Sequence, residues 1–290
     1  MDNGFLKNTL KTTVLLAGIA GLFVFVGSLF GPSGVWIGLA LGLVMVGGSY
    51  WFSDKLALKA ARAQLVTREQ APEFYGMVER LAERAGMPTP RVGISPSPQP
   101  NAFATGRSPR HAVVVATEGL LRTLSYDEVE GVMAHELMHV KHRDILIGSI
   151  AAAVATGISA LANWAMWMGM FGGGDDDRPN PIALLAISIL APLAAGLMQM
   201  AISRSREFEA DRGAAQLLGT GEPLARALEK IEVLARQAPM QVAPQQAYAW
   251  IHNPLTEAPK RRQGVDLARL FSTHPDTRER ISRLRQMSFA

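Results

Sequence analysis

The chain has 290 residues, enough for one large domain or two small ones. Hydrophobic residues make up 48% of it and charged residues 19%, a composition that is apolar for a soluble protein. There are no cysteines, which excludes disulfides and thiolate ligands, so any metal must be held by imidazole and carboxylate. The net charge of +4 is not gathered into a basic and aromatic surface, and we therefore expect no nucleic-acid partner.

The first element in chain order is an uncharged block at residues 12–53. A membrane crossing needs about 20 apolar residues, so this block can form two spans with a break at the sequence "GPSG", Gly31–Gly34. A cleaved signal peptide is the alternative for its first half, but the apolar second half favours a helical hairpin. Residues 145–203 contain two further uncharged stretches and predict a second hairpin. The sequence thus predicts four transmembrane helices.

Lysine and arginine lie at the same side of all four predicted spans, whereas the two opposite turns are uncharged or net acidic. The positive-inside rule then places both termini and both polar segments, residues 54–144 and 204–290, in the cytoplasm. The two segments together are long enough for a folded domain with its own core, and we expect them to pack together.

The first polar segment predicts helix and strand in alternation. A helix starts at Pro72 and stops around Gly86, and short strands follow in "RVGIS", "NAFATG" and "HAVVVATEG". Ser125 to Glu128 matches a capping box, so another helix should begin at about Tyr126.

The second polar segment predicts two helices in "SRSREFEADRGAAQLLG" and "EPLARALEKIEVLARQ". A poorly periodic segment follows at residues 238–264, and a last helix restarts after His274. The whole pattern indicates an α+β protein that is mainly α, with a small sheet.

The helix that begins at Tyr126 carries an H-E-x-x-H sequence from His135 to His139. Residues four apart lie on one helical face, so both imidazoles can bind one zinc ion. Glu136 is rotated by about 100° from His135, which places it beside the ligands. There it can take a proton from a water that the metal acidifies and carry it to the leaving amine. Two solvated surface histidines are the alternative.

A catalytic zinc needs a third protein ligand. His142 and Asp144 lie too far along a straight helix to share the ion, His142 being about 10.5 Å along the axis from His135. Glu207 and Asp211 lie four apart on one face of a later helix and could supply a ligand and a carboxylate that orients a ligand histidine. Their spacing alone is equally compatible with a solvated run of charges.

Four sequences, "NAFATG", "HELMHV", "SRSREFEAD" and "THPDTRERI", occur in this order around the paired apolar segments. Together they resemble those of the HtpX-type membrane metalloproteases, bacterial relatives of the CAAX prenyl proteases, over essentially the whole chain. The resemblance implies a zincin-like catalytic domain with one zinc ion per chain. It also implies that Glu207 is the third ligand and that Asp211 lies next to the metal site.

The resemblance further implies how substrate is held. Asn101, followed by Ala102 and Phe103, would lie on an edge strand beside the scissile bond, where an extended peptide can pair with the strand. His274 would stabilise the tetrahedral intermediate, a step that needs a donor directed at the developing oxyanion.

The function that the resemblance implies is that of a zinc-dependent endopeptidase of the bacterial inner membrane. Its substrates would be misfolded membrane proteins or unfolded polypeptides, in quality control and stress response. If the motif helix continues into the third span at Ile145, the zinc lies one to two turns below the membrane surface, on the cytoplasmic side.

Three alternatives remain. A site-2-type intramembrane protease would place H-E-x-x-H inside an apolar span, but charged residues surround it here. A prenyl-protein protease would release a tripeptide from a farnesylated substrate. A membrane scaffold or transporter would have no use for Glu136.

Overall fold

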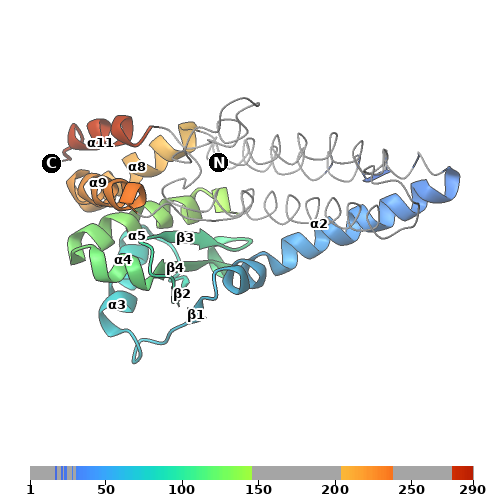
Figure 1. Cartoon of the computed structure of the whole chain (residues 1–290), viewed down its shortest axis with the longest axis horizontal. Coiled ribbons are helices and arrows are strands. Elements are labelled where there is room, and N and C mark those ends of the chain that lie inside the picture. Colours follow the sequence, from blue (N-terminus) through green and yellow to red (C-terminus); the bar gives the residue numbers. More distant parts are fainter. Residues whose placement is uncertain are drawn as a thin grey trace, which may run out of the picture.

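The structure is a computed structural model that describes residues 31–145, 204–237 and 276–289, with isolated positions between 17 and 28. Figure 1 shows one long helix, α2 (Pro32–Ala60), projecting away from the end of the molecule where the strands and the other labelled helices gather. Three of the four predicted spans fall largely or wholly outside the described residues.

Helix α2 begins at the break predicted in "GPSG". Gly31 has a φ of 85°, a left-handed value that glycine adopts without penalty, and Pro32 occupies the first helical turn. Large apolar side chains of α2 are exposed, among them Trp36 and Val44, each at 71%. Within the part of the chain that the structure describes, no helix combines the length and apolarity needed to cross a bilayer. The four-span arrangement therefore stays a prediction.

The predicted small sheet is present. Its strand order is β1-β2-β4-β3, with β2 and β4 parallel and the outer strands antiparallel to their neighbours. The strands are β1 (Gln64–Leu65), β2 (Arg91–Ser95), β3 (Ala102–Thr105) and β4 (Val113–Thr117). The strands predicted in "RVGIS", "NAFATG" and "HAVVVATEG" are confirmed, and β3 is an edge strand of the described sheet.

Side chains alternate between the two faces of the sheet. Phe103, Val113 and Val115 point to one face and pack against Ala57 and Leu58 at the end of α2. The opposite face packs against the main core, which contains apolar residues of the other helices. The end of α2 thus packs directly onto the sheet.

The remaining helices surround one central helix, α5 (Tyr126–Lys141), which packs against β3, α3, α8 and α9. The others are α3 (Pro72–Arg84), α4 (Glu118–Thr123), α8 (Arg204–Leu218), α9 (Glu222–Gln237), α11 (Thr277–Arg285) and a 3₁₀ turn, η1 (Pro109–His111). The capping box of Ser125 and Glu128 is formed, so α5 starts where the sequence predicts. Helix α4 was not predicted. The Thr117 side chain caps it by accepting a hydrogen bond from the Leu120 amide.

Two glycines let the partner helices approach α5 closely. A Cβ at Gly131 would lie 2.6 Å from the Leu224 amide nitrogen at the start of α9, and one at Gly213 of α8 would lie 2.8 Å from the Met138 sulfur. These contacts bring the second polar segment of the chain against the helix that carries H-E-x-x-H.

The motif helix was expected to continue without interruption into the third predicted span, and this expectation is wrong because the helix is interrupted before Asp144. Helix α5 ends at Lys141, His142 forms its C-cap, and Arg143 has a φ of 61°. This left-handed backbone breaks the helical path before a new turn begins at Asp144.

Candidate metal centre

Three side chains from two helices converge on one point. His135 and His139 come from α5 and Glu207 from α8, and their ligand atoms all lie within 4.8 Å of one another. The two Nε2 atoms are 3.2 Å apart, and the Glu207 carboxylate oxygens lie 3.7 Å from His135 Nε2 and 3.5 Å from His139 Nε2. Tetrahedral zinc with bonds of about 2.1 Å requires ligand atoms about 3.4 Å apart. The three groups therefore fit one zinc ion.

His135 is held from its far side by a carboxylate. Its Nδ1 lies 2.9 Å from Asp211 Oδ1, one turn along α8 from Glu207. Burial alone would raise the pKa of Asp211, but the Arg280 guanidinium and His135 outweigh it and lower that pKa. Asp211 is therefore an ionised carboxylate beside His135.

Arg280 of α11 completes this side of the centre. It is 2% exposed, it forms two hydrogen bonds with Asp211, and its Nη1 lies 3.5 Å from Glu207 Oε2. Arg280 lies within the sequence "THPDTRERI" but was not predicted to take part in the site. The available signal was its position one turn before Leu284, on the buried face of α11.

His139 also meets a second carboxylate. Its Nδ1 lies 3.4 Å from Asp144 Oδ2, and Asp144 Oδ1 lies 3.8 Å from Arg206 Nη1. A straight helix would place Asp144 too far along the axis to reach the site. The helix is broken at Arg143, and Asp144 instead turns back toward the metal ligands.

The charges of the buried groups favour a divalent cation. Four acidic side chains, Glu136, Glu207, Asp211 and Asp144, share the site with two guanidiniums, Arg206 and Arg280, so acidic groups outnumber the arginines. Burial alone would lower the pKa of His139, but Asp144, Glu207 and Glu136 outweigh it and raise that pKa to about 9. A metal that binds His139 must displace this proton.

Glu136 lies beside the three ligands and is 6% exposed. Burial raises its pKa, and the nearby Glu207 carboxylate adds to the effect, while His135, His139 and Arg280 act in the opposite direction. A carboxylate with a raised pKa holds a proton more readily, which suits a group that must accept and then donate one.

The predicted substrate residues lie at the start of the edge strand. Asn101 is buried, and its backbone N–H donates a hydrogen bond to Thr117 Oγ1 at 2.9 Å. Strand β3 packs against α5, the helix that carries H-E-x-x-H. Ala102 and Phe103 bury their side chains, so a bound peptide would meet their main chain. His274 lies outside the described residues, and its role stays a prediction.

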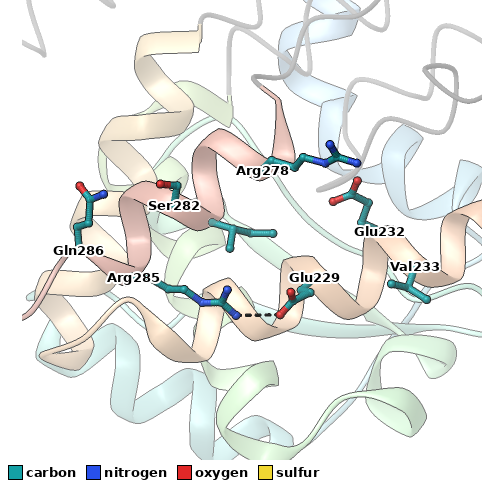
Figure 2. Close-up of a pocket in the computed structure, with 8 residues that line it drawn as sticks. Glu229, Glu232, Val233, Arg278, Ser282, Arg285 and Gln286 are labelled. Atoms are coloured by element: carbon teal, nitrogen blue, oxygen red, sulfur yellow. Dashed lines mark hydrogen bonds and ion pairs between the residues drawn. The ribbon is translucent and has the colours of Figure 1, made fainter.

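A separate cavity of about 600 Å³ lies between α9 and α11 (Figure 2). It is lined by Glu229, Glu232, Val233, Arg278, Ile281, Ser282, Arg285 and Gln286. An ion pair of 2.8 Å joins Arg285 to Glu229 at its edge. None of the metal-site residues lines this cavity, so it is not the metal centre.

Fold and site together define a zinc metalloprotease, with two histidines of one helix and a glutamate of another forming a potential metal-binding site. Residues 68–288 match Peptidase family M48, and the chain belongs to this family. It is 53% identical over 287 residues to proteins named "Protease HtpX homolog" from Burkholderia thailandensis strain E264 and Burkholderia mallei strain SAVP1, with 97% of each chain covered. The crystal structure of S. mikatae Ste24p has a similar fold, with a TM-score of 0.52 and 21% identity over 98% of this chain and 66% of that one. The resemblance inferred from the four sequences is confirmed.

Proposed function

We propose that this protein is a zinc-dependent endopeptidase at the cytoplasmic face of the bacterial inner membrane, where it hydrolyses peptide bonds of misfolded membrane proteins. The observation that carries the proposal is the convergence of His135, His139 and Glu207, with the buried Glu136 close enough to interact electrostatically with all three. This combination of three ligands and one free carboxylate is the arrangement that metal-assisted peptide hydrolysis needs.

In this mechanism His135, His139 and Glu207 would hold the zinc ion, which supplies a Lewis acid that polarises a carbonyl and acidifies water. Glu136 accepts the proton of the attacking water on its carboxylate and delivers it to the leaving amine. Its raised pKa favours the first of these steps, because a stronger base accepts the proton more readily. Asp211 and Arg280 keep His135 in one orientation while the proton moves.

Substrate would lie along β3 as an additional strand. An edge strand offers main-chain hydrogen bonds to an extended peptide, which gives binding with broad tolerance of sequence. The Asn101 side chain and His274 would donate hydrogen bonds to the oxyanion as it forms. Such a binding mode suits unfolded polypeptides, because pairing with a strand edge requires an extended segment.

The membrane location is supported by the uncharged segments of the sequence and by the exposed apolar side chains of α2. Helix α5 itself is enclosed by α3, α8, α9 and β3, with charged groups at the metal site. That environment is unlike the apolar span in which a site-2-type protease would carry the same motif. Because Asp144 and Arg206 flank residues 145–203, the active site would lie close to the bilayer surface.

Glu136→Gln tests the proposal. We expect proteolysis of unfolded casein to fall by at least about 100-fold, because the proton acceptor is lost. Zinc content should stay at one per chain, since the ligands are intact. Glu130→Gln, a partly exposed change on the same helix, is the matched control and should retain activity. Unchanged proteolysis in Glu136→Gln, or loss of its zinc, would contradict the role given to Glu136.

The location and the substrate class need a second experiment. The protein reconstituted in liposomes should cleave an unfolded segment tethered to the bilayer faster than the same segment free in solution. Equal rates on the two substrates would contradict a preference for membrane proteins. Release of a tripeptide from a farnesylated peptide, without cleavage of casein, would indicate a prenyl-protein protease instead.

A further inference from the structure

The break after α5 has a consequence for the metal site. In a straight helix the side chains of His139 and Asp144, five residues apart, would point away from each other. The φ of 61° at Arg143 turns the chain so that Asp144 becomes buried, with Oδ2 3.4 Å from His139 Nδ1. A non-glycine residue in this backbone region is uncommon and is held in place only when the surroundings over-determine it.

The contacts around His139 repeat those around His135. Each histidine presents Nε2 to the other ligands, and each has Nδ1 directed at an aspartate. Each aspartate in turn faces a buried arginine. For His135 the pair is Asp211 and Arg280; for His139 it is Asp144 and Arg206. The second set is looser, with distances of 3.4 and 3.8 Å against 2.9 and 2.7 Å.

We infer that Asp144 is a positioning residue for the zinc ligand His139, and that Arg206 holds Asp144 in the orientation this requires. The inference rests on the proposed function and adds a residue to the same site. A carboxylate on Nδ1 sets the tautomer and the ring orientation, so that Nε2 presents its lone pair to the metal and becomes a stronger base. Asp144 would do for His139 what Asp211 does for His135.

The place of this pair in the sequence gives it a second consequence. Asp144 is the last polar residue before the predicted membrane hairpin, residues 145–203, and Arg206 lies shortly after the end of that hairpin. Their contact joins the two ends of residues 145–203 at a metal ligand. Zinc affinity therefore depends on how these ends are held, and a change that separates them weakens metal binding without touching a ligand.

Zinc affinity of the full-length protein tests this directly. The apoprotein, prepared with a chelator and kept in detergent, is titrated with zinc against a fluorescent indicator. We expect Asp144→Asn to weaken zinc binding by about 10- to 100-fold. Asp211→Asn should weaken it at least as much, because its contact with histidine is shorter. Asp127→Asn, an exposed change on α5, is the matched control and should leave the affinity unchanged.

Arg206 is tested by a double-mutant cycle. Arg206→Gln should weaken zinc binding by less than Asp144→Asn, and it should have no further effect when Asp144 is already asparagine. Asp144→Glu keeps the charge but displaces the carboxylate, so its affinity should lie between those of the wild type and Asp144→Asn. This variant also tests the inference if Asp144→Asn does not fold. The absorption bands of bound Co²⁺ should shift in Asp144→Asn, because they report the ligand geometry at the metal.

The outcomes are separable. If the wild type itself takes up no zinc, the proposed function fails. If the wild type binds one zinc and Asp144→Asn binds it equally tightly, with unchanged Co²⁺ bands, the positioning role of Asp144 is overturned and the proposed function stands. If Arg206→Gln and Asp144→Asn weaken binding additively, the role of Arg206 through Asp144 is overturned.

Discussion

Arg280 on α11 donates two hydrogen bonds to the Asp211 carboxylate on α8, at 2.7 Å from Nη2 to Oδ1 and 2.9 Å from Nε to Oδ2. Both side chains are almost completely buried. Because Asp211 contacts His135, this pair ties the C-terminal helix of the chain to the first ligand of the metal centre. The pair is a two-point contact, which fixes orientation as well as distance.

Arg280→Gln should lower the free energy of unfolding by about 3–5 kcal/mol, because it leaves the buried Asp211 charge without its partner. Arg280→Lys should lower it less, since lysine keeps the charge but cannot form the two-point contact. Thermal unfolding of the apoprotein measures both. Arg278→Gln, an exposed change two residues earlier, should stay within about 0.5 kcal/mol of the wild type. A similar loss in Arg278→Gln would show that α11 responds to any change of charge.

Glu207→Ala should reduce zinc occupancy well below one per chain, because it removes one of three protein ligands. Metal analysis after dialysis measures the occupancy. Glu209→Ala is the control, since Glu209 is an exposed residue two positions along the same helix. Full occupancy in Glu207→Ala would direct attention to Asp144 as a ligand in its place.

Asn101→Ala should lower kcat/KM by about 10²-fold or more, because a donor to the oxyanion is lost, and zinc content should not change. Gln99→Ala, two residues earlier in the same segment, is the control. Peptide hydrolysis and metal analysis of the same preparations separate the two effects. An unchanged kcat/KM would mean that Asn101 serves only the start of β3.

The environment of Glu128 should make the stability of the fold depend on pH, independently of metal binding. Burial alone would raise its pKa, but Lys230, at 2.8 Å, and the Ser125 amide outweigh it and lower that pKa. A lowered pKa stabilises the fold above the unfolded-state value of 4.5, and this contribution is lost as the pH falls through the folded-state value. Glu128→Gln should therefore unfold at a lower temperature than the wild type at pH 7.

Under acid conditions that difference should shrink, because the wild-type carboxyl is then protonated too. Asp127→Asn, an exposed change in the same helical turn, controls for the general effect of a charge near the helix start. A difference between wild type and Glu128→Gln that persists at a pH well below 4 would contradict the assignment.

The local structure of this protein could be predicted from its sequence. The capping box of Ser125 and Glu128 placed the start of α5, and the four-residue spacing of His135 and His139 put both imidazoles on one face. Such features depend on contacts within one or two helical turns, which the helix geometry dictates. Glu207 was also predicted as a ligand, although this role was implied by the resemblance and not by the spacing of residues.

Tertiary structure alone decided the surroundings of the ligands. Asp144 reaches His139 because Arg143 leaves the helical path, and the sequence "HVKHRD" has no glycine or proline to mark that break. Arg280 reaches Asp211 because α11 packs against α8, a contact between residues 69 positions apart. Local periodicity does not encode which buried faces meet, because that choice depends on the packing of the whole core. The relative position of the two ligand histidines follows from the geometry of one helix, whereas the groups that orient them are brought there by the tertiary fold.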